Sequence, residues 1–130
     1  MSGLSDFAEV AVINALLRAT ALNITSVYVS LHTADPGDAG AANELTDSGY
    51  ARKISTYDAP TSGAGTTQNS GDITFNAIAD AGPFTVTHVG MWDAATAGNL
   101  LLTAALTASK AFSLNDVPRF PAGSLTVTAA

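Results

Sequence analysis

The sequence predicts a mainly β domain, an antiparallel β-sandwich or small barrel of about seven strands with one N-terminal α-helix. Three observations support this fold class. Short segments rich in β-branched and aromatic residues are each bounded by Gly, Pro, Asn, Asp or Ser. Helical periodicity is confined to the first 20 residues. No helical segments alternate with the strands, which argues against a parallel α/β sheet.

The predicted N-terminal helix at 4–20 has the expected signals at both ends. Ser5 can cap the helix, and Asp6 and Glu9 lie in its first turn, where carboxylates oppose the positive end of the helix dipole. Arg18 falls in the last turn, where a cation is favoured. These signals predict the position of the helix but not what it packs against.

The same helix carries a wide apolar stripe. The residues that recur at helical spacing are Phe7, Val10, Ala11, Asn14 and Leu17, and Ile13 and Leu16 widen the stripe. A stripe of this width on a short helix has to be covered, either by the sheet of the same domain or by a partner. We expect it to be wider than the sheet needs.

Strands follow the helix, with turn residues between them. They are expected at 26–31, 50–57, 72–78, 84–92, 99–106, 110–114 and 124–128, with a short strand near Thr67. Loops are expected at 32–49, where Pro36 fits a turn, and at 60–71, which is polar and rich in glycine. Gly90 interrupts an apolar strand and predicts a bulge or a close backbone contact there. With no linker or repeat in the sequence, we expect residues 1–130 to form a single domain, with the N-terminal helix followed by a β domain at 25–128.

Composition excludes several function classes. The net charge is −6 with five scattered basic residues, whereas nucleic-acid binders cluster Lys and Arg, so we expect no direct nucleic-acid binding. No apolar run is long enough to span a membrane, and acidic residues stand where a signal peptide would be basic, so synthesis in a cytoplasm is expected. The chain has no cysteine, hence no disulfide or thiolate metal site. Only 12% of residues are charged, which suits a surface packed against neighbours.

No catalytic or cofactor-binding motif is present, so neither a catalytic residue nor a cofactor is predicted. The two histidines are expected to be structural: His88 as a hydrogen-bonded histidine near the core and His32 as the residue that fixes the following turn. No serine lies in a nucleophile-elbow motif. The acidic residues of one loop do not match the calcium-loop pattern, so no metal is predicted; they are Asp35, Asp38, Glu44 and Asp47.

Six segments, in order, resemble a family of small phage virion structural proteins that are often labelled tail fibre, minor structural or decoration proteins. They are the LHTADPG segment at 31–37, NE at 43–44 with GYAR at 49–52, ITF at 73–75, VTHVG at 86–90, LLTAAL at 101–106 and PRFPAGSL at 118–125. The resemblance covers roughly residues 25 to 128. It implies a non-enzymatic component of the virion.

The resemblance also guides the expected role. A chain of 130 residues leaves little room for a long fibre shaft, which favours a capsid decoration (cement) protein that binds the assembled shell at the outer capsid surface. Such proteins commonly sit as trimers, so the expected partners are further copies of the chain and the major capsid protein or other virion proteins. The candidate contact residues are Phe7, Val10, Ile13 and Leu17 of the helix and Asp35, Pro36 and Gly37 of the loop.

Three alternatives remain open at this stage. The first is a tail fibre, tail-tip or neck module that attaches by the helix and contributes to host attachment. The second is a module that binds a host glycan receptor, with Trp92 and Tyr50 or Tyr57 as stacking platforms, which requires those rings to be exposed. The third, an enzyme, requires a pocket that joins His32 or His88 to a carboxylate.

Overall fold

A five-stranded antiparallel sheet with the order β1-β7-β6-β2-β3 forms the larger layer of the fold. The computed structural model describes residues 3–38, 42–61 and 63–129. Its elements are β1 (Gly3–Leu4), α1 (Asp6–Arg18), β2 (Val27–His32), β3 (Lys53–Ser55), β4 (Thr66–Gln68), β5 (Ile73–Thr74), β6 (Phe84–Trp92), β7 (Leu100–Phe112), β8 (Arg119–Phe120) and β9 (Thr126–Thr128).

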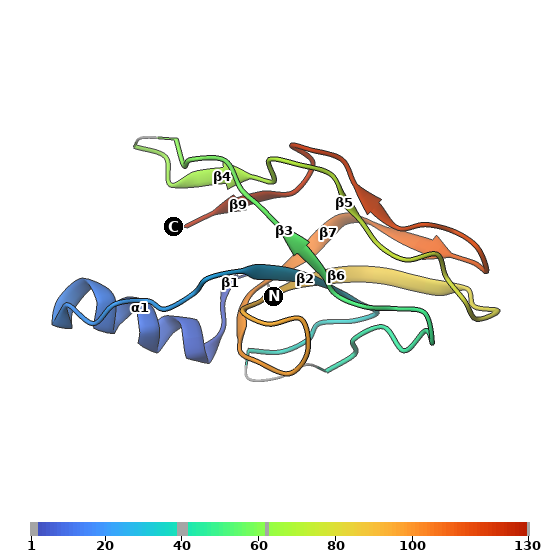
Figure 1. The fold of residues 1–130 in the computed structure, drawn as a ribbon, viewed down its shortest axis with the longest axis horizontal. Coiled ribbons are helices and arrows are strands. Elements are labelled where there is room, and N and C mark those ends of the chain that lie inside the picture. The colour runs from blue at the N-terminus through green and yellow to red at the C-terminus, as the bar shows by residue number, and fades with distance from the viewer. Residues whose placement is uncertain (1–2, 39–41, 62, 130) are drawn as a thin grey trace.

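Two small antiparallel sheets, β4-β9 and β5-β8, form the second layer along one side of the large sheet (Figure 1). The core lies between the layers. The large sheet contributes Val29, Leu31, Val86, Val89 and Met91, and the segments facing it contribute Leu45, Ile73, Phe75, Ile78 and Leu125. The mainly β fold with one N-terminal helix and a sandwich-like arrangement is therefore confirmed. Among the described elements the sheets do not close into a barrel.

Several strand boundaries differ from the expected ones. The strands expected at 99–106 and 110–114 are one continuous strand, β7, because its two halves pair with the single long strand β6. The strand expected at 72–78 is reduced to β5, and its partner β8 lies where no strand was expected. The lengths of these strands depend on pairing between segments that are far apart in the sequence, and local composition does not indicate such pairing.

The pairing of β6 with β7 contains a large irregularity. Val86 pairs with Lys110, but His88 pairs with Ala105, so β7 carries extra residues opposite Thr87. Because a bulge changes which side chains face inward, Val86 and Val89 are both buried in the core. Strict alternation along 84–92 would place His88 on the same face as Val86, but His88 does not join Val86 in the core. Its ring is half-buried, and Nδ1 lies 2.8 Å from Oγ1 of Thr87.

The helix α1 projects from one end of the molecule, and the chain returns alongside it before entering β2 (Figure 1). Among the helices and strands that the structure describes, α1 contacts β1 and β7 alone. The connections from β5 to β6 and from β7 to β8 lie at the opposite end of the molecule (Figure 1). We call residues 5–26, the helix with its returning segment, the arm.

Candidate interaction surface

Ser5 fixes the root of the arm. Its backbone N–H donates to the carbonyl of Leu101 at 2.9 Å, and its hydroxyl donates to the carbonyl of Leu100. The same hydroxyl oxygen accepts a hydrogen bond from the backbone N–H of Ala8 at 3.1 Å, which is the predicted N-cap. Because the Ser5 side chain is buried, one residue both starts the helix and ties it to β7.

The helix turns its alanine-rich side toward the domain and most of its large apolar residues toward solvent. Ala8 is buried, and Val12 and Ala15, which lie on the same side of the helix, are half-buried. Five large side chains are exposed: Phe7 by 42%, Val10 by 63%, Ile13 by 54%, Leu16 by 74% and Leu17 by 77%. Of the two coverings considered for the stripe, the domain's own sheet is therefore excluded for these five side chains.

The end of the helix directs the chain back along it. Ala19 adopts a left-handed conformation with φ of 54°, and its N–H and that of Thr20 both donate to the carbonyl of Asn14. The returning residues and the helix enclose a shallow groove of about 400 Å³, lined by Phe7, Val10, Ala11, Asn14, Thr20, Ala21 and Leu22. The groove is apolar along most of its length, so the arm presents apolar surface from both of its chain segments.

The three candidate loop residues have different environments. Asp35 accepts a hydrogen bond from the N–H of Gly37 at 2.9 Å, and both residues are exposed. Pro36 is less than 2% exposed, so the expectation that it contacts a partner needs correction: its ring leaves almost no surface for one. The N–H of Asp6 donates to the carbonyl of Asp38 at 3.1 Å, which places the start of the helix beside the end of this loop. No pattern in the sequence indicates this proximity.

A buried polar network lies on the opposite face of β2 from Val29 and Leu31. Oγ of Ser30 accepts from Nε1 of Trp92 at 2.8 Å and lies 2.7 Å from Nε2 of His32. The other ring nitrogen of His32 lies 2.9 Å from the carbonyl of Ala42. Since a carbonyl only accepts, Nδ1 carries the proton and Nε2 accepts from the Ser30 hydroxyl. Burial lowers the pKa of His32, partly offset by the Ala42 carbonyl.

His32 was expected to fix the turn that follows it. Its ring instead holds the later part of the same loop, through the carbonyl of Ala42. The contact between Ser30 and His32 also resembles the hydrogen bond between a serine nucleophile and its base. Both side chains, however, have no exposed surface, and the outer nitrogen of the ring faces a backbone carbonyl instead of a carboxylate. The pair therefore holds the loop against β2 and offers no access to a substrate.

Arg52 covers this network. Its guanidinium carbon lies 3.7 Å from the centre of the Trp92 ring, and two of its nitrogens each donate to Glu44 at 2.9 Å. Tyr50 also donates to Glu44 at 2.7 Å. Burial opposes ionisation of Glu44, but these hydrogen bonds outweigh it and lower its pKa. The third nitrogen of Arg52 donates to the carbonyl of Ala97 at 2.9 Å, so one side chain joins two loops.

These contacts exclude the exposed stacking platform that the glycan alternative required. Trp92 is only 4% exposed and lies beneath Arg52. Tyr50 and Tyr57 are half-buried, and burial, followed for Tyr50 by the nearby Glu44 carboxylate, raises the pKa of both hydroxyls. The GYAR segment supplied Tyr50 and Arg52 to the resemblance, but nothing in its pattern indicated that Arg52 would close over a tryptophan 40 residues later.

The acidic residues considered as cation ligands serve separate structural purposes. Glu44 pairs with Arg52, and Asp47 accepts from the N–H groups of Ala79 and Asp80 at 3.0 and 2.8 Å. In residues 3–38, 42–61 and 63–129, no three His, Cys, Asp or Glu side chains gather as a metal site would require. No helix in these segments is long and apolar enough to cross a membrane.

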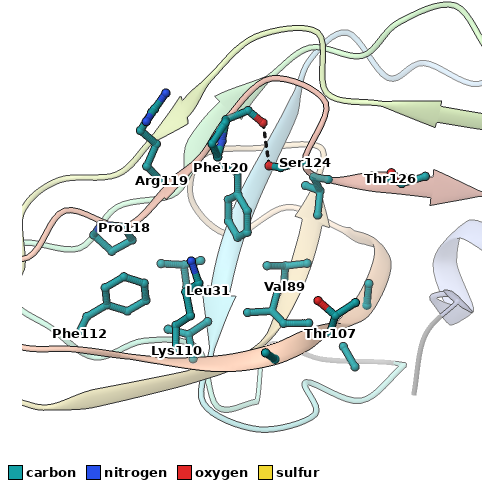
Figure 2. Close-up of a pocket in the computed structure, with 17 residues that line it drawn as sticks. Leu31, Val89, Thr107, Lys110, Phe112, Pro118, Arg119, Phe120, Ser124 and Thr126 are labelled. Carbon is teal, nitrogen blue, oxygen red and sulfur yellow. Dashed lines mark hydrogen bonds between the residues drawn. The ribbon is translucent and has the colours of Figure 1, made fainter.

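A second hollow of about 370 Å³ lies between β7 and the chain around β8 (Figure 2). Its walls include Leu31, Val89, Phe112 and Phe120, and Lys110 and Arg119 also line it. None of its described lining residues is a histidine or a carboxylate. It therefore does not join His32 or His88 to an acid, which was the arrangement that the enzyme alternative required.

Comparison with known proteins gives one informative result. A family model described as podophage GP4 fiber I protein gp80 matches residues 3–128. No curated protein matches the chain. The match spans nearly the whole chain, including both the arm and the β body described above. The chain therefore belongs to the podophage GP4 fiber I protein gp80 family and is a structural component of a phage virion.

Proposed function

We propose that this chain is a subunit of a fibre at the tail or neck of a phage particle, where it contributes to host attachment without catalysing a reaction. The observation that carries this proposal is the match of a fibre-protein family across residues 3–128. The family description favours the tail-fibre alternative over the capsid decoration role expected from the sequence alone.

The arm supports an assembly role. Five large apolar side chains of α1 are between 42% and 77% exposed, whereas contiguous apolar patches on a soluble monomer mark interaction sites. The arm lies at one end of the molecule and the connections β5–β6 and β7–β8 at the other (Figure 1). In this proposal, the arm joins the subunit to other virion chains, and the far end is presented outward.

Leu114 and Val117 give the outward end an exposed apolar surface that a receptor could bind. Both lie in the connection between β7 and β8, and each is about half exposed. Neighbouring Asp116 holds the turn, since its carboxylate accepts from the N–H of Ser113 at 2.7 Å. The apolar tip is therefore presented on an ordered turn, which limits the entropy lost when a receptor binds.

A reconstruction of purified particles by cryo-electron microscopy tests the proposal. Density that fits the domain at the tail or neck supports it, and repeated density over the capsid shell would replace it with the decoration role. Particles assembled with Leu16→Glu should lose this density, because the variant places a charge on the arm's apolar face. Particles with Ile54→Glu, a similarly exposed apolar residue on β3, should retain it. Equal occupancy of both variants would remove the arm from the proposal.

A further inference from the structure

The hollow between β7 and the chain around β8 combines apolar walls with one unpaired amino group. No carboxylate is among its described lining residues, and the charged residues that line it are Lys110 and Arg119. The guanidinium of Arg119 pairs with Asp72 at 2.8 Å, and Figure 2 shows it pointing away from the hollow. Lys110 forms no ion pair with a residue that the structure describes. Lys110 is therefore the cation that an anionic ligand would meet in the hollow.

The register of β7 places Lys110 on the inner face of the large sheet. It pairs with Val86, which is 1% exposed and belongs to the core, and cross-strand partners point to the same face. Phe112, two residues later, pairs with Phe84 and lies on that face too. Figure 2 shows the Lys110 side chain extending from β7 toward the segment that carries Phe120. Lys110 is exposed, so a ligand that enters the hollow can reach its amino group.

The hollow continues along β7 into a neighbouring hollow of about 450 Å³, which has no charged residue among its described lining. The two hollows share five lining residues: Val89, Ala104, Ala105, Leu125 and Thr126. The combined space follows β7 from Leu102 in the second hollow to Phe112 in the first. It is therefore elongated, with the Lys110 amine toward one end, and suits an apolar chain better than a compact ring system.

A partner strand does not suit this space. The extra residues of β7 opposite Thr87 lie beside the hollow, and bulges and inward-pointing lysines are features that keep sheet edges from pairing with other strands. An alkyl chain has no peptide backbone and needs no edge to pair with. One lysine ammonium also matches the single charge of a carboxylate, whereas a phosphate is more often held by an arginine fork or a helix N-terminus.

We infer that this hollow binds a small single-chain amphiphile with a carboxylate head group. The carboxylate pairs with Nζ of Lys110, and the chain lies against the half-buried side chains of Leu106, Phe112 and Phe120. The volume of about 370 Å³ falls within the range of small-molecule sites, which are mostly apolar with a few polar groups. This inference goes beyond the fibre proposal and does not depend on it, because the ligand binds the purified chain without any particle.

Isothermal titration calorimetry with sodium decanoate at pH 7, below its micellar concentration, tests the site. Decanoate should bind with a Kd of about 0.1–1 mM, and decyltrimethylammonium, which has the opposite charge, at least tenfold more weakly. Lys110→Met keeps an apolar side chain and removes the charge, so it should weaken decanoate binding at least tenfold. Lys53→Met should leave it unchanged, because Lys53 lies on β3 and its Nζ donates to Asn76 at 2.8 Å. No binding up to about 10 mM decanoate, or equal affinity for the two probes, would overturn the inference.

Nuclear magnetic resonance locates the bound chain. Nuclear Overhauser effects are expected between decanoate protons and the ring protons of Phe112 and Phe120. Effects to Ile13 and Leu17 instead would show that decanoate covers the exposed face of α1, and would overturn the site. Tighter binding of both probes to Lys110→Met would also overturn it, because Lys110 would then only protect the sheet edge. Far-ultraviolet circular dichroism checks that the variants keep their fold.

Vesicle flotation distinguishes a free carboxylate from one held in a membrane. The hollow lies between the two layers of the fold, so a carboxylate fixed at a bilayer surface should not reach it. Phosphatidylcholine vesicles that contain oleic acid should therefore carry the natural chain and Lys110→Met to the same extent. Flotation that Lys110→Met abolishes would assign the ligand to a membrane and overturn the free amphiphile.

Discussion

Replacing Gly90 by alanine would disturb the polar network between β2 and β6. A Cβ at this position would lie 2.7 Å from Oγ of Ser30 and 3.1 Å from both Nε2 of His32 and Nε1 of Trp92. These three side chains are no more than 4% exposed, so none can swing into solvent. Gly90 does not have a positive φ, and the cost of the added methyl group is therefore steric.

The magnitude follows from the contacts that must change. Adding a methyl group to a packed interior costs about 1–3 kcal/mol. Displacing Ser30 also breaks its hydrogen bonds with His32 and Trp92, and each buried group left without a partner costs about 1–3 kcal/mol. Partial relaxation of the strands recovers some of this. We expect Gly90→Ala to lower the free energy of unfolding by about 3–5 kcal/mol.

Urea unfolding at fixed protein concentration measures the change, and Gly71→Ala provides the control. A Cβ at Gly71 meets no atom within 4 Å, so that variant should be neutral or stabilised by up to about 1 kcal/mol. In a Ser30→Ala background the Oγ is gone, and Gly90→Ala should cost at least about 1 kcal/mol less than in the natural sequence. A loss below about 1 kcal/mol for Gly90→Ala, or strict additivity of the two changes, would refute this account of the network.

Three further predictions concern single side chains. Arg52→Ala should cost about 3 kcal/mol in urea unfolding, because it strands the half-buried Glu44 and uncovers the neighbouring indole, and Arg52→Lys should not restore the loss, since it lacks the planar fork. In a proton NMR titration, the pKa of the His32 ring should lie below its ordinary value of about 6.5. Because the unfolded chain then takes up the proton at a higher pH than the folded chain, the stability that neutral His32 contributes should be complete above about pH 6.5 and should decline as the pH falls below this value. A titration midpoint at or above about 6.5 would contradict this. Ser5→Ala should cost about 1–2 kcal/mol and speed amide hydrogen exchange in α1 more than in β6, whereas uniform acceleration would contradict its role at the root of the arm.

The helix was predictable because its signals are local. Ser5, Asp6, Glu9 and Arg18 act within one turn of the helix ends, so their order in the sequence is enough to place them. The strand at 84–92 was predicted with its observed boundaries, since a run of β-branched and aromatic residues between turn residues carries its own limits. The close approach at Gly90 is made by the side chains of Ser30, His32 and Trp92 rather than by another backbone segment.

The composition of the arm could not reveal which side of the helix faces the domain. Helical spacing indicated the apolar stripe, and the choice between the domain's own sheet and a partner remained open. Ser5 settled it by bonding to the carbonyl of Leu100, 95 residues away, which turned Ala8 inward and left Ile13 and Leu17 outside. Similarly, the extra residues of β7 opposite Thr87 decided that Val86 and Val89 share a face.

The mainly β class, the capped helix and the resemblance to phage virion proteins could all be read from the amino-acid order, because each depends on short-range periodicity or on motifs in series. The tertiary structure alone decided that Arg52 closes over Trp92, that Pro36 is buried and that five large side chains of α1 face outward. Those outcomes depend on which distant segments cover each residue, and burial is a property of the packed chain that no local pattern encodes.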